Sequence, residues 1–147
     1  MKISTRGRYG LRVLLELASR RGNRPVRLKE IAKSQQLSLN YIEHLIGPLV
    51  TAGMVKTVRG ISGGVQLSRN AAEIKVSEVI ALYEGSNAPV ECVDNPKVCS
   101  RSGQCVTRDI WCELKQAADK VLNSRTLQDL IEMQELKQKN AKSMYYI

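Results

Sequence analysis

The sequence predicts a mainly α-helical fold with one small β-hairpin. Apolar residues recur at helical spacing in several segments, whereas two short β-like runs, 55–59 and 65–68, flank a glycine-rich loop. The chain has 147 residues and no Phe, which suits a core of Leu, Ile, Val and Ala. This length fits one compact domain, or a small domain with an extension.

The first segment is predicted to be a helix, because apolar residues recur at i, i+3, i+4 and i+7 from Leu11. Basic residues crowd its start, where positive charge opposes the helix dipole. An external anion such as phosphate would explain them better than helix stability does. These residues are Lys2, Arg6, Arg8 and Arg12.

Two further helices and a hairpin follow. A short helix around 28–32 leads through a tight turn to a second helix, which Ser38 caps. The second helix is apolar on one face and presents Asn40, Glu43 and His44 on the other. This pattern is typical of a helix-turn-helix, and a hairpin directly after it is typical of a wing. Arg59 enters the wing loop, where it can reach a minor groove.

The C-terminal half is predicted to hold three helices. The first covers 77–84 and is capped by Ser77, and the last starts at Thr126 with Asp129 in a capping-box position. The long helix between them starts near Thr107, and its apolar stripe lacks a partner within so small a domain. A second copy would supply one, so we expect a homodimer. The stripe consists of Ile110, Trp111, Leu114, Ala117, Ala118, Val121 and Leu122.

These elements predict three regions. Residues 1–84 form a winged helix-turn-helix DNA-binding domain with a short linking helix. Residues 85–106 form a cysteine loop. Residues 107–147 form a long dimerisation helix and a C-terminal helix.

Charge and composition indicate the class of partner. Residues 1–70 hold 13 Lys and Arg against 3 Asp and Glu, a net of +10, whereas residues 71–147 carry a net of −1. A basic module joined to a neutral one indicates nucleic acid as the partner of the first. No nucleophile–base pair, P-loop or paired-carboxylate motif indicates an enzyme. The sequence has neither an apolar run of membrane length nor a signal peptide. We therefore expect a cytoplasmic protein that does not associate with a membrane.

All four cysteines lie within 92–112, spaced C-x6-C-x5-C-x6-C. Disulfides are disfavoured in a reducing cytoplasm, and zinc knots usually present tighter pairs. Spare core thiols remain an alternative. Clustering of all four in one polar loop favours a metal or an iron–sulfur cluster.

Several motifs together resemble one family. They are KISTRGRYGL at the start, Leu39-Asn40-Tyr41-Ile42-Glu43, Val58-Arg59-Gly60 with Gly63-Gly64, VSEVIALYEG, and Thr126-Leu127. In these the chain resembles the Rrf-type bacterial winged-helix transcriptional regulators, closest to an IscR-like iron–sulfur regulator of a Gram-positive bacterium. The resemblance implies a 2Fe–2S cluster, with 4Fe–4S less favoured, in the loop just before the dimerisation helix.

The resemblance also implies ligands. Cys92, Cys99 and Cys105 match the three family thiolates, with one extra residue between the first two. IscR-like members place a His three residues after the last cysteine, where this chain has Arg108. NsrR-like members supply an acidic ligand from the first helix of the other subunit, where this chain offers Arg8. A guanidinium stays protonated and cannot ligate iron.

Cys112 is our candidate for the fourth ligand. At about 100° per residue it falls off the apolar stripe, on the side of Cys105 and Arg108. Seven helical residues span about 10.5 Å, so this reading requires Cys105 to precede the helix. The alternatives are a ligand from the other subunit, a small exogenous thiol, or a carboxylate of Asp94, Asp109 or Glu113.

We expect two copies to dock on a pseudo-palindromic operator in double-stranded DNA, with recognition helices in successive major grooves. Base edges are assigned to Asn40, Glu43 and His44, although Glu43 could instead pair with an arginine on its own surface. Arg59 is assigned to the minor groove. Phosphates are assigned to Lys2, Arg6, Arg8 and Lys56, and the predicted surface also includes Ser38, Tyr41 and Gly60.

The predicted function is transcriptional regulation that senses cluster status and controls cluster-assembly or related genes. One alternative within the resembled family is a nitric-oxide or redox-sensing repressor. Another is a CymR-like repressor of cysteine metabolism that acts with a partner enzyme and without a cluster.

Overall fold

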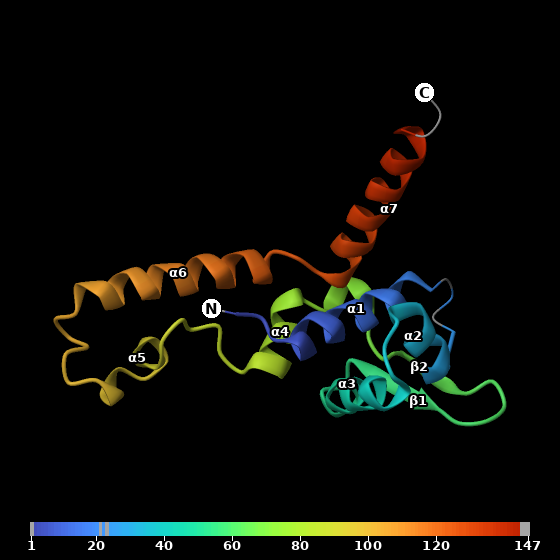
Figure 1. Ribbon diagram of the computed structural model, residues 1–147, viewed down its shortest axis with the longest axis horizontal. Helices are drawn as coiled ribbons and strands as arrows, with labels where there is room; N and C mark the ends of the chain where they lie inside the picture. The colour runs from blue at the N-terminus through green and yellow to red at the C-terminus, as the bar shows by residue number, and fades with distance from the viewer. Residues whose placement is uncertain (1, 21, 23, 145–147) are drawn as a thin grey trace.

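The computed structural model describes residues 2–20, 22 and 24–144 and confirms the mainly α-helical fold with a two-stranded antiparallel wing (Figure 1). No described helix is long and apolar enough to cross a membrane. The elements are α1 (Thr5–Ser19), α2 (Leu28–Gln35), α3 (Leu39–Thr51), β1 (Val55–Val58), β2 (Gly64–Leu67), η2 (Ala71–Glu73), α4 (Val76–Glu84), α5 (Glu91–Asp94), η3 (Pro96–Val98), α6 (Val106–Asn123) and α7 (Leu127–Met144).

The molecule consists of a head with two projections (Figure 1). Helices α1 to α4 and the wing gather in the head, α6 runs outward with α5 beside its far end, and α7 leaves in another direction. The head has one apolar core, and Leu127 at the start of α7 is fully buried in it. The largest fully buried side chains of the head besides Leu127 are Leu14, Ile31, Ile42, Leu45, Leu49, Ile74 and Ile80.

The wing pairs β1 with β2 in a register that runs from Val55 opposite Leu67 to Val58 opposite Gly64. Strand β1 is one residue shorter than the β-like run at 55–59, whereas β2 begins and ends one residue earlier than the run at 65–68. Val26, just before α2, adds a bridge to Val65 through two main-chain hydrogen bonds of 2.8 and 2.9 Å. The wing is therefore tied to the helix-turn-helix as well as to itself.

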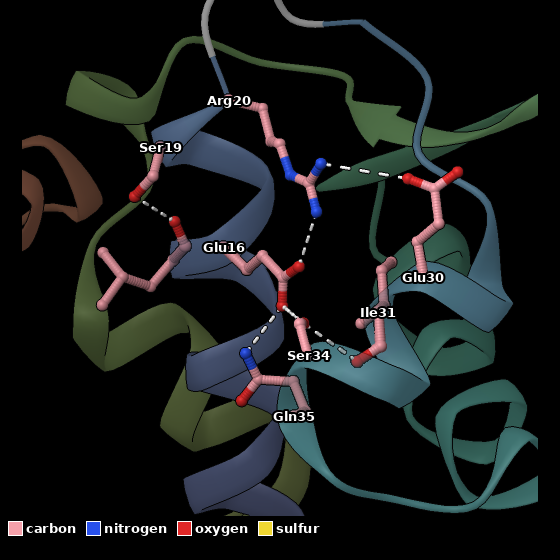
Figure 2. A network of polar contacts seen from close by, with 8 residues as sticks. Glu16, Ser19, Arg20, Glu30, Ile31, Ser34 and Gln35 are labelled. Carbon is pink, nitrogen blue, oxygen red and sulfur yellow. Dashed lines mark hydrogen bonds and ion pairs between the residues drawn. The ribbon is translucent and has the colours of Figure 1, made fainter.

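Helices α1 and α2 are joined by a polar network centred on Glu16 (Figure 2). Its carboxylate accepts hydrogen bonds from Arg20 Nη2 at 2.9 Å, Gln35 Nε2 at 2.6 Å and the Ser34 hydroxyl. Burial alone would raise the pKa of Glu16, but these hydrogen bonds and the Arg20 charge outweigh it and hold the pKa below its ordinary value. The side chain is only 12% exposed, so the network contributes to stability as well as to helix placement.

Helices α1 and α4 approach closely because α1 presents glycine to α4. A Cβ built on Gly10 would lie 2.2 Å from the ring of Tyr83, and one on Gly7 would lie 2.4 Å from Oε1 of Glu84. The Glu84 carboxylate accepts from the Ser4 main-chain N–H at 3.1 Å and from its hydroxyl at 2.6 Å. The Glu84 carboxylate thus binds the N-cap residue of α1 and leaves the basic residues at the start of this helix without a carboxylate partner among the described ion pairs.

Two local predictions have different outcomes. The capping box at Thr126 is confirmed, since Thr126 N–H donates to Asp129 Oδ2 at 2.7 Å and Asp129 N–H donates to Thr126 Oγ1 at 3.2 Å. The Ser77 cap is wrong, because α4 begins one residue earlier with Lys75 as its N-cap residue. The Ser77 hydroxyl instead donates to Asn123 Oδ1 at 2.7 Å and joins α4 to α6.

Gly10→Ala tests the close approach of α1 and α4. We expect it to lower the free energy of unfolding by about 1–3 kcal/mol, because the new methyl group forces the Tyr83 ring to move. Gly47→Ala is the matched control, since it lies on a helix with no atom within 4 Å of its Cβ position. The control should stabilise by about 0.5–1 kcal/mol in urea unfolding, and equal effects of the two changes would contradict the contact.

The Glu16 network predicts a pH dependence. A depressed folded-state pKa gives stability that is full above the unfolded pKa of about 4.3 and lost as the pH falls through the folded value. Glu16→Gln should therefore cost about 1–2 kcal/mol at neutral pH, a difference that shrinks below about pH 4. Urea unfolding at several pH values measures it, with Glu135→Gln on exposed α7 as the control. If the destabilisation by Glu16→Gln does not change with pH, the ionisation of Glu16 does not contribute to stability.

Candidate nucleic-acid interface and cysteine arm

The recognition helix α3 is built by local capping and apolar periodicity. The Ser38 hydroxyl accepts from the Tyr41 N–H at 3.2 Å, as predicted for an N-cap. The helix buries Ile42, Leu45 and Leu49 against the head. Its opposite face leaves Asn40, Glu43 and His44 exposed, where base edges could be reached.

The Tyr41 side chain, which was predicted to belong to the DNA-binding surface, packs against α1. Its ring meets the Tyr9 ring of α1 edge-on, with centroids 6.1 Å apart. Arg12 and Arg8 lie over the Tyr9 ring at 5.0 and 6.0 Å from its centroid. This group of rings and guanidinium ions joins α1 to the start of the recognition helix.

A hydrogen bond from α4 holds α3 on its core side and was not predicted from the sequence. The Tyr83 hydroxyl donates to the Leu45 main-chain oxygen at 2.7 Å. Burial, and to a lesser extent the nearby Tyr41, raises the pKa of Tyr83, so the hydroxyl stays protonated and remains a donor. The pair of small residues Gly7 and Gly10 on one face of α1 was the available signal that α4 lies close.

The wing presents its predicted residues to solvent. Lys56, Arg59 and Gly60 are all exposed, and Gly60 has a φ of 109°, which glycine adopts readily. Arg27 Nη2 donates to the Ile61 carbonyl at 2.9 Å and holds the loop tip against the head. Arg27 was not among the predicted residues, and its contact is too distant in sequence to be read from spacing.

The predicted phosphate-binding residues at the start of α1 remain available. Lys2, Arg6 and Arg8 are exposed. Within the described ranges, none of the four ion pairs involves these residues or the basic residues of the wing. Their charge is therefore not neutralised within the described head.

Residues 85–123, which we call the cysteine arm, lie outside the core. They comprise the cysteine loop and α6, and none of their three helical elements contains a buried residue. The loop was expected to be irregular, but it contains the short helices α5 and η3. All four cysteines are free thiols and partly exposed.

The arm places the thiols on short elements around one end of α6. Cys92 lies on α5, Cys99 directly follows η3, and Cys105 is the N-cap residue of α6. Cys105 thus precedes the helix, which the reading of Cys112 as a ligand requires. Hydrogen bonding with Thr107 Oγ1 at 3.1 Å, and then with the N–H groups of Arg108 and Thr107, lowers the pKa of Cys105.

The two faces of α6 differ in exposure. Partly buried residues recur at Cys105, Arg108, Cys112, Lys115 and Asp119, on the side that contacts the loop. Most of the predicted apolar stripe is exposed, with Ile110 56% and Val121 65% exposed, whereas its members Ala118 and Leu122 are partly buried. Cys112 therefore shares the loop-facing side with Cys105 and Arg108.

The donor chemistry of the loop fits an iron–sulfur cluster, because thiolate sulfur is the usual ligand of such clusters. Across the described part of the chain, no three Cys, His, Asp or Glu side chains converge closely enough to hold a metal ion. The four thiols would therefore have to draw together for such a group to bind. Asp94, one alternative ligand, is hydrogen-bonded to the Ser86 hydroxyl.

Comparisons with known proteins agree on one family. A family model described as the Rrf2 iron-dependent transcriptional regulators matches residues 3–133. The protein Rrf2 of Nitratidesulfovibrio vulgaris is 42% identical over 96% of this chain and 94% of its own length.

Two solved structures are similar in fold. The global cysteine regulator CymR of B. subtilis matches with a TM-score of 0.77 and 38% identity, over 90% of this chain and 98% of its own. IscR of T. potens matches with the same TM-score and identity, over 94% and 91%. The fold is thus equally similar to both regulators.

Proposed function

This chain belongs to the Rrf2 family of DNA-binding transcriptional regulators, and we propose that it acts as a homodimer whose cysteine loop holds an iron–sulfur cluster. The observation that carries the proposal is the placement of every thiol on one arm, outside the core of a winged-helix head. The role is regulatory rather than catalytic, and the protein acts in the cytoplasm as a repressor whose targets include cluster-assembly or related genes.

The proposed DNA contacts follow the exposed residues of the head. Asn40, Glu43 and His44 read base edges from α3, and Arg59 enters the minor groove from the wing. The phosphate contacts come from the basic start of α1 and from Lys56. Two such heads bind successive major grooves of a pseudo-palindromic operator.

The proposed dimer contact is the apolar stripe of α6. An 18-residue helix with no fully buried residue leaves most of its apolar stripe exposed, which is a liability for a monomer. A second copy of α6 would cover the stripe of the first and be covered by it, as a two-fold contact requires. Exposed Ile110 and Val121 then become buried.

The proposed ligands are Cys92, Cys99, Cys105 and, as the fourth, Cys112. Support for Cys112 is its place on the loop-facing side of α6, together with the N-cap position of Cys105. When bound, a 2Fe–2S cluster would supply an oxidation-sensitive link between the loop and α6. A 4Fe–4S cluster is the less favoured form.

The cysteine arm is joined to the DNA-binding head through the end of α4, which could couple the state of the arm to DNA affinity. Residues Tyr83 and Glu84 of α4, which contact α3 and the start of α1, directly precede the arm at Gly85. A change in how the arm is held would shift the population of DNA-binding states of the head. The head and the thiol arm then act as one regulator.

A second candidate is a regulator of the same family that uses its thiols without a cluster, together with a partner enzyme. Two observations favour it: among the described residues no three potential metal ligands converge, and the fold is as similar to CymR as to IscR. Cluster-based sensing of nitric oxide or redox state is a further variant of the first candidate.

Anaerobic purification separates these candidates. We expect a coloured protein with iron and sulfide in about equal amounts, near two of each per chain for a 2Fe–2S cluster. Replacing Cys92, Cys99 and Cys105 by Ser should abolish both. A colourless, iron-free protein that resists anaerobic reconstitution would favour the second candidate and overturn the first.

Arg59→Ala tests the wing. We expect it to weaken binding of a mixed-sequence duplex of about 30 base pairs by about 1–2 kcal/mol and to flatten the salt dependence, because a cation leaves the DNA surface. Lys139→Ala on α7 removes the same charge at a site away from the head and should change affinity little. Fluorescence anisotropy at several salt concentrations measures both, and equal losses would show a general charge effect.

A further inference from the structure

One residue of α6 holds the main chain of two cysteines. The Arg108 side-chain Nε donates to the carbonyl oxygen of Cys92 at 2.9 Å. The Arg108 main-chain N–H donates to the carbonyl oxygen of Cys105 at 3.0 Å. Cys92 and Cys105 are thirteen positions apart in the sequence, and Arg108 brings them to one end of α6.

The side-chain bond is not required by the helix. The bond to Cys105 belongs to the first turn of α6, whereas the bond to Cys92 crosses to another element. A guanidinium stays charged at every relevant pH, so this bond is charge-assisted throughout that range. In the portion of the chain that is described, Arg108 takes part in none of the carboxylate ion pairs.

Few other contacts hold this part of the arm. Nearer the head, Asp119 accepts from Asn87 at 3.2 Å and from Lys115 at 2.6 Å. Among the described residues, the Arg108 bond is the hydrogen bond that joins α5 to α6, and the charge of Asp94 on α5 also acts on Lys115 of α6. Because α5 and α6 bury no residue, removing this bond would release Cys92 without disturbing the core.

We propose that Arg108 is a positioning residue that holds the main chain of Cys92 near that of Cys105, so that the two thiols need less rearrangement to share a soft metal. The inference rests on the proposed binding of iron by the loop. It gives Arg108 a function at a position where it cannot be a ligand. Prior arrangement lowers the ordering cost of binding, so the affinity for a metal held by two thiols depends on this side chain.

Cadmium binding to the full chain tests the arrangement of Cys92 and Cys105 independently of iron. With Cys99 and Cys112 replaced by Ser, only Cys92 and Cys105 remain, and sulfur-to-cadmium absorption reports binding to reduced, metal-free protein. We expect Arg108→Ala to weaken cadmium affinity about tenfold. Arg108→Lys, which can still donate to the Cys92 carbonyl, should restore much of it.

Arg101→Ala is the matched control, because Arg101 is an exposed arginine of the same loop. It should bind cadmium as the parent does, and all variants should unfold in urea at the same midpoint. Equal cadmium affinity of Arg108→Ala and the parent would overturn the inference, as would equal losses at Arg101 and Arg108. Iron and sulfide in the four-cysteine chain are measured separately, so an iron-free wild type would refute the proposed function, not the role of Arg108.

Discussion

The contact between α1 and the end of α4 is the constraint on which the rest of the molecule depends. Gly10 and Gly7 leave room for Tyr83 and Glu84, and any side chain in their place would collide with them. Tyr83 then reaches the main chain of the recognition helix, and Glu84 reaches the N-terminus of α1. The next residue, Gly85, begins the cysteine arm with a φ of 73°. Two adjacent side chains that hold α3 and the start of α1 therefore lie directly before the irregular segment that leads to the thiols.

The head and the arm are stabilised by different physical means. The head has an apolar core that includes the first residue of α7 and a semi-buried network around Glu16. The helical elements of the arm have no fully buried residue, and hydrogen bonds from Arg108, Asn87 and Ser77 help to set its position. An element held by a few polar contacts changes its arrangement at small cost in free energy. That property suits a sensor, because ligand binding at the arm can alter its placement while the head stays folded.

Sequence patterns predicted what depends on local spacing. Apolar periodicity located α1, α3 and α6, Ser38 was correctly identified as a cap, and Thr126 with Asp129 forms the expected box. The same reasoning failed at Ser77, because a tertiary contact with Asn123 takes its hydroxyl. The helical turns within the cysteine loop and the contacts of Glu84 and Arg108 also went unpredicted. Those contacts join residues 80 and 16 positions apart, and no periodicity encodes such pairs. The ligand roles of the four cysteines remain predictions.

The central claim is that the state of the thiol arm sets the DNA affinity of the head. The most direct measurement is the affinity of iron-loaded and iron-free protein for one duplex, selected by this protein from a random-sequence pool under anaerobic conditions. We expect the two forms to differ in affinity by about fivefold or more, and a variant with all four cysteines replaced by Ser to bind as the iron-free form does. Equal affinity of the loaded and iron-free forms for every selected duplex would contradict it.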